Sequence, residues 1–138
     1  MAEVLFEDPF KIAVYPSHPL SKNAFIHPAD LIDQTLLLLD EGHCLRDQAL
    51  QFCQLQSIHQ QQDLRATSLE TLRQMVRAGT GITFIPEIAI RDTDDGIRYI
   101  PFSSPPPSRS ICLVWRKTSP RTMLIDYLKN IILKLRKQ

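Results

Sequence analysis

The segment Leu36–Cys53, LLLLDEGHCLRDQALQFC, changes its hydrophobic period in the middle. Its run of four leucines is too short for a helix and ends in Asp-Glu-Gly turn chemistry, so it predicts a buried β-strand. From Cys44 onward the apolar residues recur at helical spacing, which predicts a short amphipathic helix over 44–53. A strand followed directly by a helix is typical of α/β domains, and this constrains the fold more than any other feature.

The same alternation of strand and helix patterns continues along the chain. A second helix is predicted to begin with a T-x-x-E capping box, Thr67 to Glu70, and to end at Gly79. A loop over 54–63, a turn over 92–96 and an extended proline-rich connector over 103–108 separate the elements. We therefore expect an α/β fold with a mixed or parallel sheet. The other predicted helical segments are short turns over 28–33 and 86–90 and a final helix from Pro120. The predicted strands cover 9–15, 36–39, 64–67, 82–86, 97–100 and 111–115.

Charge and hydropathy exclude several classes of function. The 138 residues suffice for one domain with a core, and a net charge of +1 gives no electrostatic reason to expect this chain itself to grip DNA. No stretch reaches the roughly 18 apolar residues that span a membrane, and the N-terminus lacks a signal-peptide pattern. We therefore expect a cytoplasmic location and no membrane contact. Thiols are normally reduced there, so a disulfide would be transient or sensing rather than structural.

Two cysteines bracket the first predicted helix, Cys44 at its first turn and Cys53 nine residues later. A helix N-terminus carries partial positive charge, and His43 (if protonated) and Arg46 would add to it. Such surroundings favour the thiolate form of a cysteine. A thiolate attacks peroxide to form a sulfenic acid, which a neighbouring thiol can convert to a disulfide.

Helix geometry opposes a bond between these two cysteines. Nine helical steps of about 1.5 Å place Cys44 and Cys53 roughly 13 Å apart along the axis, whereas a disulfide needs Cα atoms within about 7 Å. An intact helix therefore forbids the bond, and the bond forbids an intact helix. Oxidation of the pair would couple a chemical event to a change of shape, as a switch requires.

The residues alone leave other interpretations of this pair open. Buried cysteines commonly act as small hydrophobic residues. A zinc site from His43, Cys44, Cys53 and His59 is possible in residue type, although the spacing matches no compact finger pattern. A Cys-His hydrolase would need an orienting third group, and adjacent His and Cys side chains normally point in different directions.

Three strings carry a resemblance to a known family: EGHCLRDQALQFC, LRATSLETLRQMVRAGTGITFIP and RSICLVWRKTSPR. They resemble the regulatory domain of the OxyR family, the peroxide-sensing LysR-type transcriptional regulators. The GHCLRD…C element is highly specific, whereas GTGITFIP is shared more widely among LysR-type regulators. The resemblance implies a periplasmic-binding-protein-like α/β fold. Residues 1–105 would be mainly the second regulatory subdomain, and 106–138 a strand and helix returning to an incomplete first subdomain, without the DNA-binding domain.

The resemblance also assigns roles to individual residues. It implies that Cys44 is the peroxidatic cysteine and Cys53 the resolving cysteine. His43, Asp47 and Arg109 would support the peroxide pocket, with Arg109 brought near the reactive cysteine. It implies no metal and no cofactor.

Three further residues have simpler interpretations. Thr67 and Ser68 lie where LysR-type relatives bind small effectors at a helix N-terminus, which makes them an alternative effector site, although a capping role would account for them. Cys112 alternates with apolar neighbours in SICLVW and is expected to be an ordinary strand residue.

The resemblance implies a hydrogen-peroxide-sensing regulatory domain of a transcription activator, not an enzyme. Its partners would be hydrogen peroxide, a thiol reductant such as glutaredoxin and further copies of itself, as a dimer or tetramer of the full-length regulator. The helix over 69–79 would lie at the contact between copies. Promoter DNA and RNA polymerase would be reached only through the full-length protein. The alternatives are a small-ligand-binding LysR-type effector domain without redox switching, and a thiol peroxidase.

Overall fold

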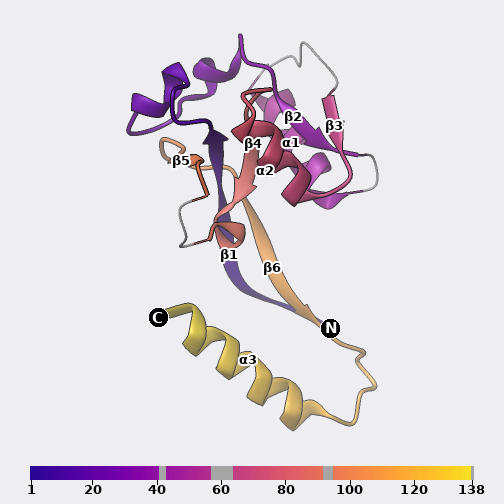
Figure 1. Cartoon of the computed structure of the whole chain (residues 1–138). Coiled ribbons are helices and arrows are strands. Elements are labelled where there is room, and N and C mark those ends of the chain that lie inside the picture. The colour runs from indigo at the N-terminus through magenta and orange to yellow at the C-terminus, as the bar shows by residue number, and fades with distance from the viewer. Residues whose placement is uncertain (41–42, 57–63, 92–94, 138) are drawn as a thin grey trace. The chain divides into compact units, whose positions relative to one another are not determined.

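The computed structural model describes residues 1–40, 43–56, 64–91 and 95–137 (Figure 1). The chain divides into two compact units, which we call unit 1 (Met1–Asp8 and Ser108–Gln138) and unit 2 (Pro9–Pro107). The chain thus passes between the units twice, once inside its first strand and once after the proline-rich connector. Met1–Asp8 group with the C-terminal residues rather than with the rest of 1–105. The assignment of these units to the family's two subdomains stays a prediction.

Three antiparallel strands form the main sheet of unit 2. The first strand, β1 (Ala2–Val14), enters from unit 1 and lies between β4 (Thr83–Pro86) and β5 (Arg98–Pro101). Its residue Ile12 faces Phe84 on one side and Ile100 on the other. All three of these side chains are buried, so this sheet supplies much of the core.

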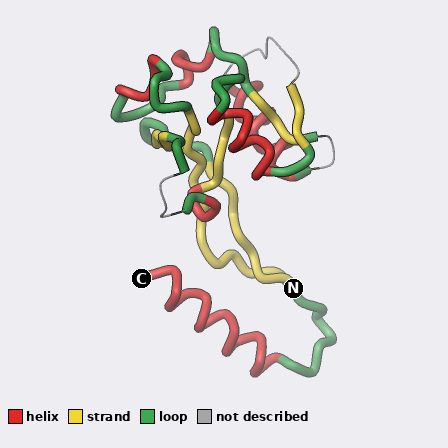
Figure 2. Tube along the Cα trace, viewed as in Figure 1, coloured by secondary structure: helices red, strands yellow, loops and turns green. Residues whose placement is uncertain are grey.

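A smaller parallel sheet carries the segment that opened the sequence analysis. Strand β2 (Leu37–Leu39) is wholly buried and pairs in parallel with β3 (Leu64–Ala66). Helix α1 (Cys44–Leu55) lies in the crossover between them (Figure 1, Figure 2). A parallel pair requires such a crossover, and the prediction of a strand followed by a helix is confirmed. The expectation of one mixed or parallel sheet is wrong, because the antiparallel pairs of β1 with β4 and β5 and the parallel pair of β2 with β3 lie in two separate sheets.

Helix α2 (Leu69–Arg77) packs its apolar face onto its own unit. Leu72 and Val76 are buried in a cluster with Leu37 and Ile85. The helix ends as expected, just before Gly79. Gly79 adopts a positive φ of 81°, and the Thr80 amide donates a hydrogen bond to the Met75 carbonyl. Its predicted place at a contact between copies stays a prediction.

The predicted capping box at the start of α2 is wrong by one residue. Ser68, not Thr67, is the N-cap, and its side-chain oxygen accepts a hydrogen bond from the Thr71 amide. Glu70 instead accepts from Arg73 at 3.0 Å. Both Thr and Ser are good caps; Thr67 lies between the end of β3 at Ala66 and the N-cap Ser68.

Short 3₁₀ turns confirm the helical turns expected around residues 28–33 and 86–90. They are η2 (Pro28–Leu31) and η3 (Glu87–Ala89), and a further turn, η1 (Pro19–Lys22), was not predicted. Most of the predicted loop over 54–63 and of the turn over 92–96 lies outside the described residues; Gln54 and Leu55 continue α1. Among the residues described, no helix combines the length and apolar content needed to cross a membrane.

Unit 1 consists of the start of β1, strand β6 (Ser108–Val114) and helix α3 (Thr122–Lys137). Strand β6 pairs with β1, which explains why β1 begins at Ala2 rather than at the predicted residue 9. Helix α3 contacts this strand pair through Lys129, which donates to Glu3 at 2.9 Å, and through Arg136, which lies over the Phe6 ring.

Candidate redox site

The first turn of α1 carries three of the residues singled out in the sequence. Cys44 is the first helical residue and is exposed, and His43 is the N-cap, with an extended backbone (φ −89°, ψ 129°). Asp47, also exposed, lies in the same turn and its amide approaches the His43 carbonyl at 3.4 Å. The structure thus groups His43, Cys44 and Asp47 at a helix N-terminus, where backbone amides favour negative charge. An exposed thiol in this position is accessible to a small oxidant.

Cys53 has the opposite environment near the other end of the same helix. Its side chain is 5% exposed and belongs to the core cluster that includes Ala49 and Phe84. Burial raises the pKa of the Cys53 thiol to about 11, because a thiolate would lose its hydration there. At neutral pH Cys53 is therefore held as an unreactive thiol. Both cysteines are free, and the helix between them is continuous from Cys44 to Leu55.

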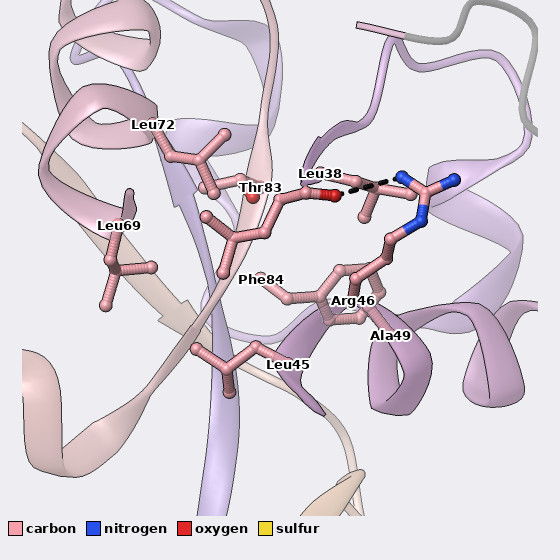
Figure 3. Close-up of a pocket in the computed structure, with 9 residues that line it drawn as sticks. Leu38, Leu45, Arg46, Ala49, Leu69, Leu72, Thr83 and Phe84 are labelled. Atoms are coloured by element: carbon pink, nitrogen blue, oxygen red, sulfur yellow. Dashed lines mark hydrogen bonds between the residues drawn. The ribbon is translucent and has the colours of Figure 1, made fainter. Parts of the chain in front are cut away.

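Helix α1 is fastened to the core through its first two turns. Leu45 and Ala49 pack toward the core, while the Arg46 guanidinium donates to the Leu39 carbonyl at 3.0 Å, at the end of β2 (Figure 3). A gap of about 10 Å³ remains between α1, α2 and the sheet. It is lined mostly by apolar side chains and has room for about one water molecule, so it is a packing gap rather than an effector pocket.

Arg109 lies in unit 1, on β6, rather than in the same unit as Cys44. Its Nε donates to Asp8 Oδ2 at 2.9 Å, and the Asp8 side chain is fully buried. Sequence reasoning missed Asp8, because an acidic residue in an alternating strand gives no local sign of burial. The contribution of Arg109 to a peroxide pocket stays a prediction.

The alternative effector residues lie at the entry of α2. The Ser68 hydroxyl accepts from the Thr71 amide at 3.2 Å and shares a hydrogen bond with the Thr71 hydroxyl at 2.9 Å, whereas Thr67 is exposed. Ser68 is thus already engaged as a cap. Effector binding at these two residues stays a prediction.

The remaining candidates concern metal binding and the third thiol. In the described part of the chain, no group of three or more His, Cys, Asp or Glu side chains is placed to hold a metal ion. His59, one of the four residues of the possible zinc site, lies outside the described residues. Cys112 is an exposed residue of β6, which confirms its placement in a strand.

Comparison with known proteins identifies the family of this chain. Residues 1–135 match the family model described as LysR substrate binding domain. The chain is 46% identical over 130 residues to the DNA-binding transcriptional dual regulator OxyR of Escherichia coli K12, covering 93% of this chain and 43% of that protein. The chain thus spans less than half the length of the curated relatives that it matches.

Solved structures give the same result at the level of the fold. The reduced form of the OxyR regulatory domain from Pseudomonas aeruginosa is 36% identical with a TM-score of 0.84, over 97% of this chain and 66% of that chain. An oxidized form of OxyR is 40% identical with a TM-score of 0.77, over 97% of this chain and 64% of that chain. The chain therefore belongs to the family of LysR substrate-binding domains, with the α/β, periplasmic-binding-protein-like fold of OxyR regulatory domains.

Proposed function

We propose that this chain is the hydrogen-peroxide-sensing regulatory domain of a LysR-type transcription regulator, switched by a reversible disulfide between Cys44 and Cys53. The observation that supports this most directly is the contrast between the two thiols. One is exposed at a helix N-terminus, and the other is buried in the core near the end of the same unbroken helix. The relatives described as peroxide-inducible activators support the same function.

The chemistry proceeds in two steps and consumes one peroxide. The Cys44 thiolate attacks one oxygen of hydrogen peroxide, the O–O bond breaks, and a sulfenic acid forms while hydroxide leaves and is protonated to water. The Cys53 sulfur, as a thiolate after loss of its proton, then attacks the Cys44 sulfur and releases the sulfenic oxygen as a second water. The pair of thiols is oxidised by two electrons and the peroxide is reduced to two waters. A dithiol reductant of the glutaredoxin type would restore both thiols.

The second step requires α1 to open. Two residues nine helical steps apart lie roughly 13 Å apart along the helix axis, well beyond the reach of a disulfide. Cys53 must therefore leave the core, and the intervening segment must lose its helical form. Opening the helix removes apolar side chains from the core, which costs free energy. This cost favours the helical form for as long as the thiols are reduced. His43, Asp47 and Arg109 are proposed to support the reactive thiol.

In a full-length regulator the remodelled segment would alter contacts between subunits. We propose a homo-oligomer, a dimer or tetramer, whose rearrangement changes its engagement of promoter DNA and RNA polymerase. These partners are proposals for the whole protein.

Peptide mapping after oxidation tests the switch. The reduced chain receives one equivalent of hydrogen peroxide, free thiols are alkylated, and the disulfide-linked peptides are identified by mass spectrometry. We expect a Cys44–Cys53 link in the wild type, none in Cys44→Ser, and a trapped Cys44 sulfenic acid in Cys53→Ser. Cys112→Ser is the matched control and should behave like the wild type. A wild-type chain with Cys44 left unoxidised, or with its disulfide at Cys112, would contradict the proposal.

Two further measurements, the number of peroxide equivalents consumed and the signalling of variants, separate this function from the two alternatives. A thiol peroxidase would consume many equivalents of peroxide when a reductant is supplied, whereas a sensor reacts once per cycle. An effector domain without redox chemistry would keep its signalling in Cys44→Ser and lose it after substitution of Thr67.

A further inference from the structure

Phe52, the residue immediately before Cys53, belongs to a cluster of aromatic rings in unit 2. Its ring lies 5.8 Å from that of Phe84 and 5.3 Å from that of Phe102, with both pairs edge-to-face. Phe84 and Phe102 stack on each other at 5.7 Å. Such contacts depend on ring position and angle. The Phe52 side chain, next to the buried thiol, is therefore held in a defined place by one ring from β4 and one ring from the residue after β5.

Phe102 belongs to this aromatic cluster and directly precedes the connector from unit 2 to unit 1. It directly follows β5 and is buried, and the Ser103 amide beyond it donates to the Ile26 carbonyl at 2.9 Å. The connector 103–107 then leads into β6 of unit 1. At the far end of the connector, the Pro107 carbonyl accepts from the Phe10 amide at 2.8 Å.

The last turn of α1 and the start of this connector also line one cavity. Its volume is about 160 Å³, and its lining includes Phe52 of α1, Gln56 directly after that helix, and Phe102, Ser103 and Pro105 from the connector side. A movement of the end of α1 therefore changes the surroundings of the connector directly, without an intermediate element.

We propose that Phe52 transmits oxidation of Cys44 and Cys53 to the connector 103–107 through Phe102. The inference rests on the proposed disulfide switch. Bringing Cys53 to Cys44 requires α1 to unwind, and Phe52 is joined to Cys53 by a single peptide bond. Its ring cannot stay between Phe84 and Phe102 while the neighbouring residue leaves the core. Phe102 then loses an edge-to-face partner, and the hydrogen bond from Ser103 to Ile26 loses the packing that holds it.

Amide hydrogen exchange of Ser103, measured by NMR on the full chain, tests this coupling. In the wild type we expect oxidation to speed the exchange by about tenfold or more, since local opening governs exchange of such amides. In Phe52→Leu the exchange should already be fast in the reduced state, and oxidation should add less than about twofold. Phe102→Leu, which alters the other side of the same contact, should show the same loss of redox dependence.

Phe10→Leu is the matched control. It alters a buried ring of the same cluster, 6.3 Å from Phe84, but on β1 rather than on α1. It should keep the full change of Ser103 exchange upon oxidation, which a merely structural role of the cluster would not predict. If the Phe52→Leu chain also keeps that full change, the inference is overturned.

Mass spectrometry of each sample records whether the Cys44–Cys53 bond has formed, so the two proposals fail separately. A wild-type disulfide with unchanged Ser103 exchange overturns the role of Phe52 alone. Absence of the disulfide overturns the switch and this inference together.

Discussion

The Arg46 guanidinium donates a hydrogen bond to the Leu39 carbonyl at 3.0 Å and so ties the first turn of α1 to the end of β2. A hydrogen bond from a charged group contributes about 1.5–3 kcal/mol. Arg46→Ala should therefore favour opening of α1 and speed the second step, from the Cys44 sulfenic acid to the Cys44–Cys53 bond, by about tenfold, since about 1.4 kcal/mol corresponds to a factor of ten. Quenching the reaction at set times and alkylating the remaining free thiols measures the rate of disulfide formation. Arg91→Ala, a change of an exposed arginine, should leave the rate unaltered, and an equal or slower rate in Arg46→Ala would refute the expectation.

The N-cap of α2 gives a second prediction, because only one of two adjacent hydroxyl residues caps the helix. Ser68→Ala removes the acceptor of the Thr71 amide and should lower the free energy of unfolding by about 1 kcal/mol. Thr67→Ala, one residue earlier and exposed, should change it by less than about 0.5 kcal/mol. Urea denaturation of both variants measures the difference. Equal losses would mean that Thr67 shares the capping role.

The elements that sequence patterns predicted well are those with local causes. The start of α1 at Cys44 follows from turn residues and a change of period within a few positions, and the end of α2 follows from Gly79. The exposed thiol at a helix N-terminus could be predicted for the same reason, because its position depends on the residues next to it.

Features that depend on distant partners escaped prediction. The N-terminal half of β1 forms because β6, roughly a hundred residues later, pairs with it. The burial of Asp8 has the same origin, since its partner Arg109 is 101 positions away. The aromatic contacts of Phe52 likewise join α1 to β4 and to the residue after β5. Hydrophobic period shows which side of an element is apolar, but it does not show which side chains meet.

The Arg109–Asp8 pair gives a third prediction. Arg109→Ala leaves the fully buried Asp8 carboxylate without this donor and should lower the free energy of unfolding by about 2–4 kcal/mol. Asp8→Asn together with Arg109→Gln should recover part of the loss, because neither charge then remains. Lys129→Ala, which breaks an exposed pair in the same unit, should have a much smaller effect. A loss in Arg109→Ala no greater than that in Lys129→Ala would show that the pair contributes little.

The substitutions Asp8→Asn and Arg109→Gln, made singly, test the proposed role of Arg109 at the peroxide site. In Asp8→Asn the arginine keeps its charge, so peroxide oxidation of Cys44 should proceed at the wild-type rate while stability falls. In Arg109→Gln the oxidation should slow by about tenfold or more if the guanidinium stabilises developing negative charge. Trapping of the sulfenic acid in a Cys53→Ser background measures the rate. Equal rates in the two variants would restrict Arg109 to a structural role.

Burial of Cys53 predicts a loss of stability at alkaline pH. The thiol has a pKa of about 11 in the folded chain against an ordinary value of 9.0, so between these values the unfolded chain binds fewer protons than the folded chain. Stability is therefore fully present below pH 9.0 and falls as pH rises toward 11, by about 3 kcal/mol in total, since each pKa unit corresponds to about 1.4 kcal/mol. Urea denaturation of the wild type and of Cys53→Ala at about pH 8, below both pKa values, and at about pH 10.5, between them, isolates the contribution. Tyr99, whose pKa burial also raises, contributes equally to both proteins and cancels in the difference. The stability advantage of the wild type over Cys53→Ala should shrink at the higher pH, and an advantage that stays constant or grows would mean that Cys53 ionises as an exposed thiol does.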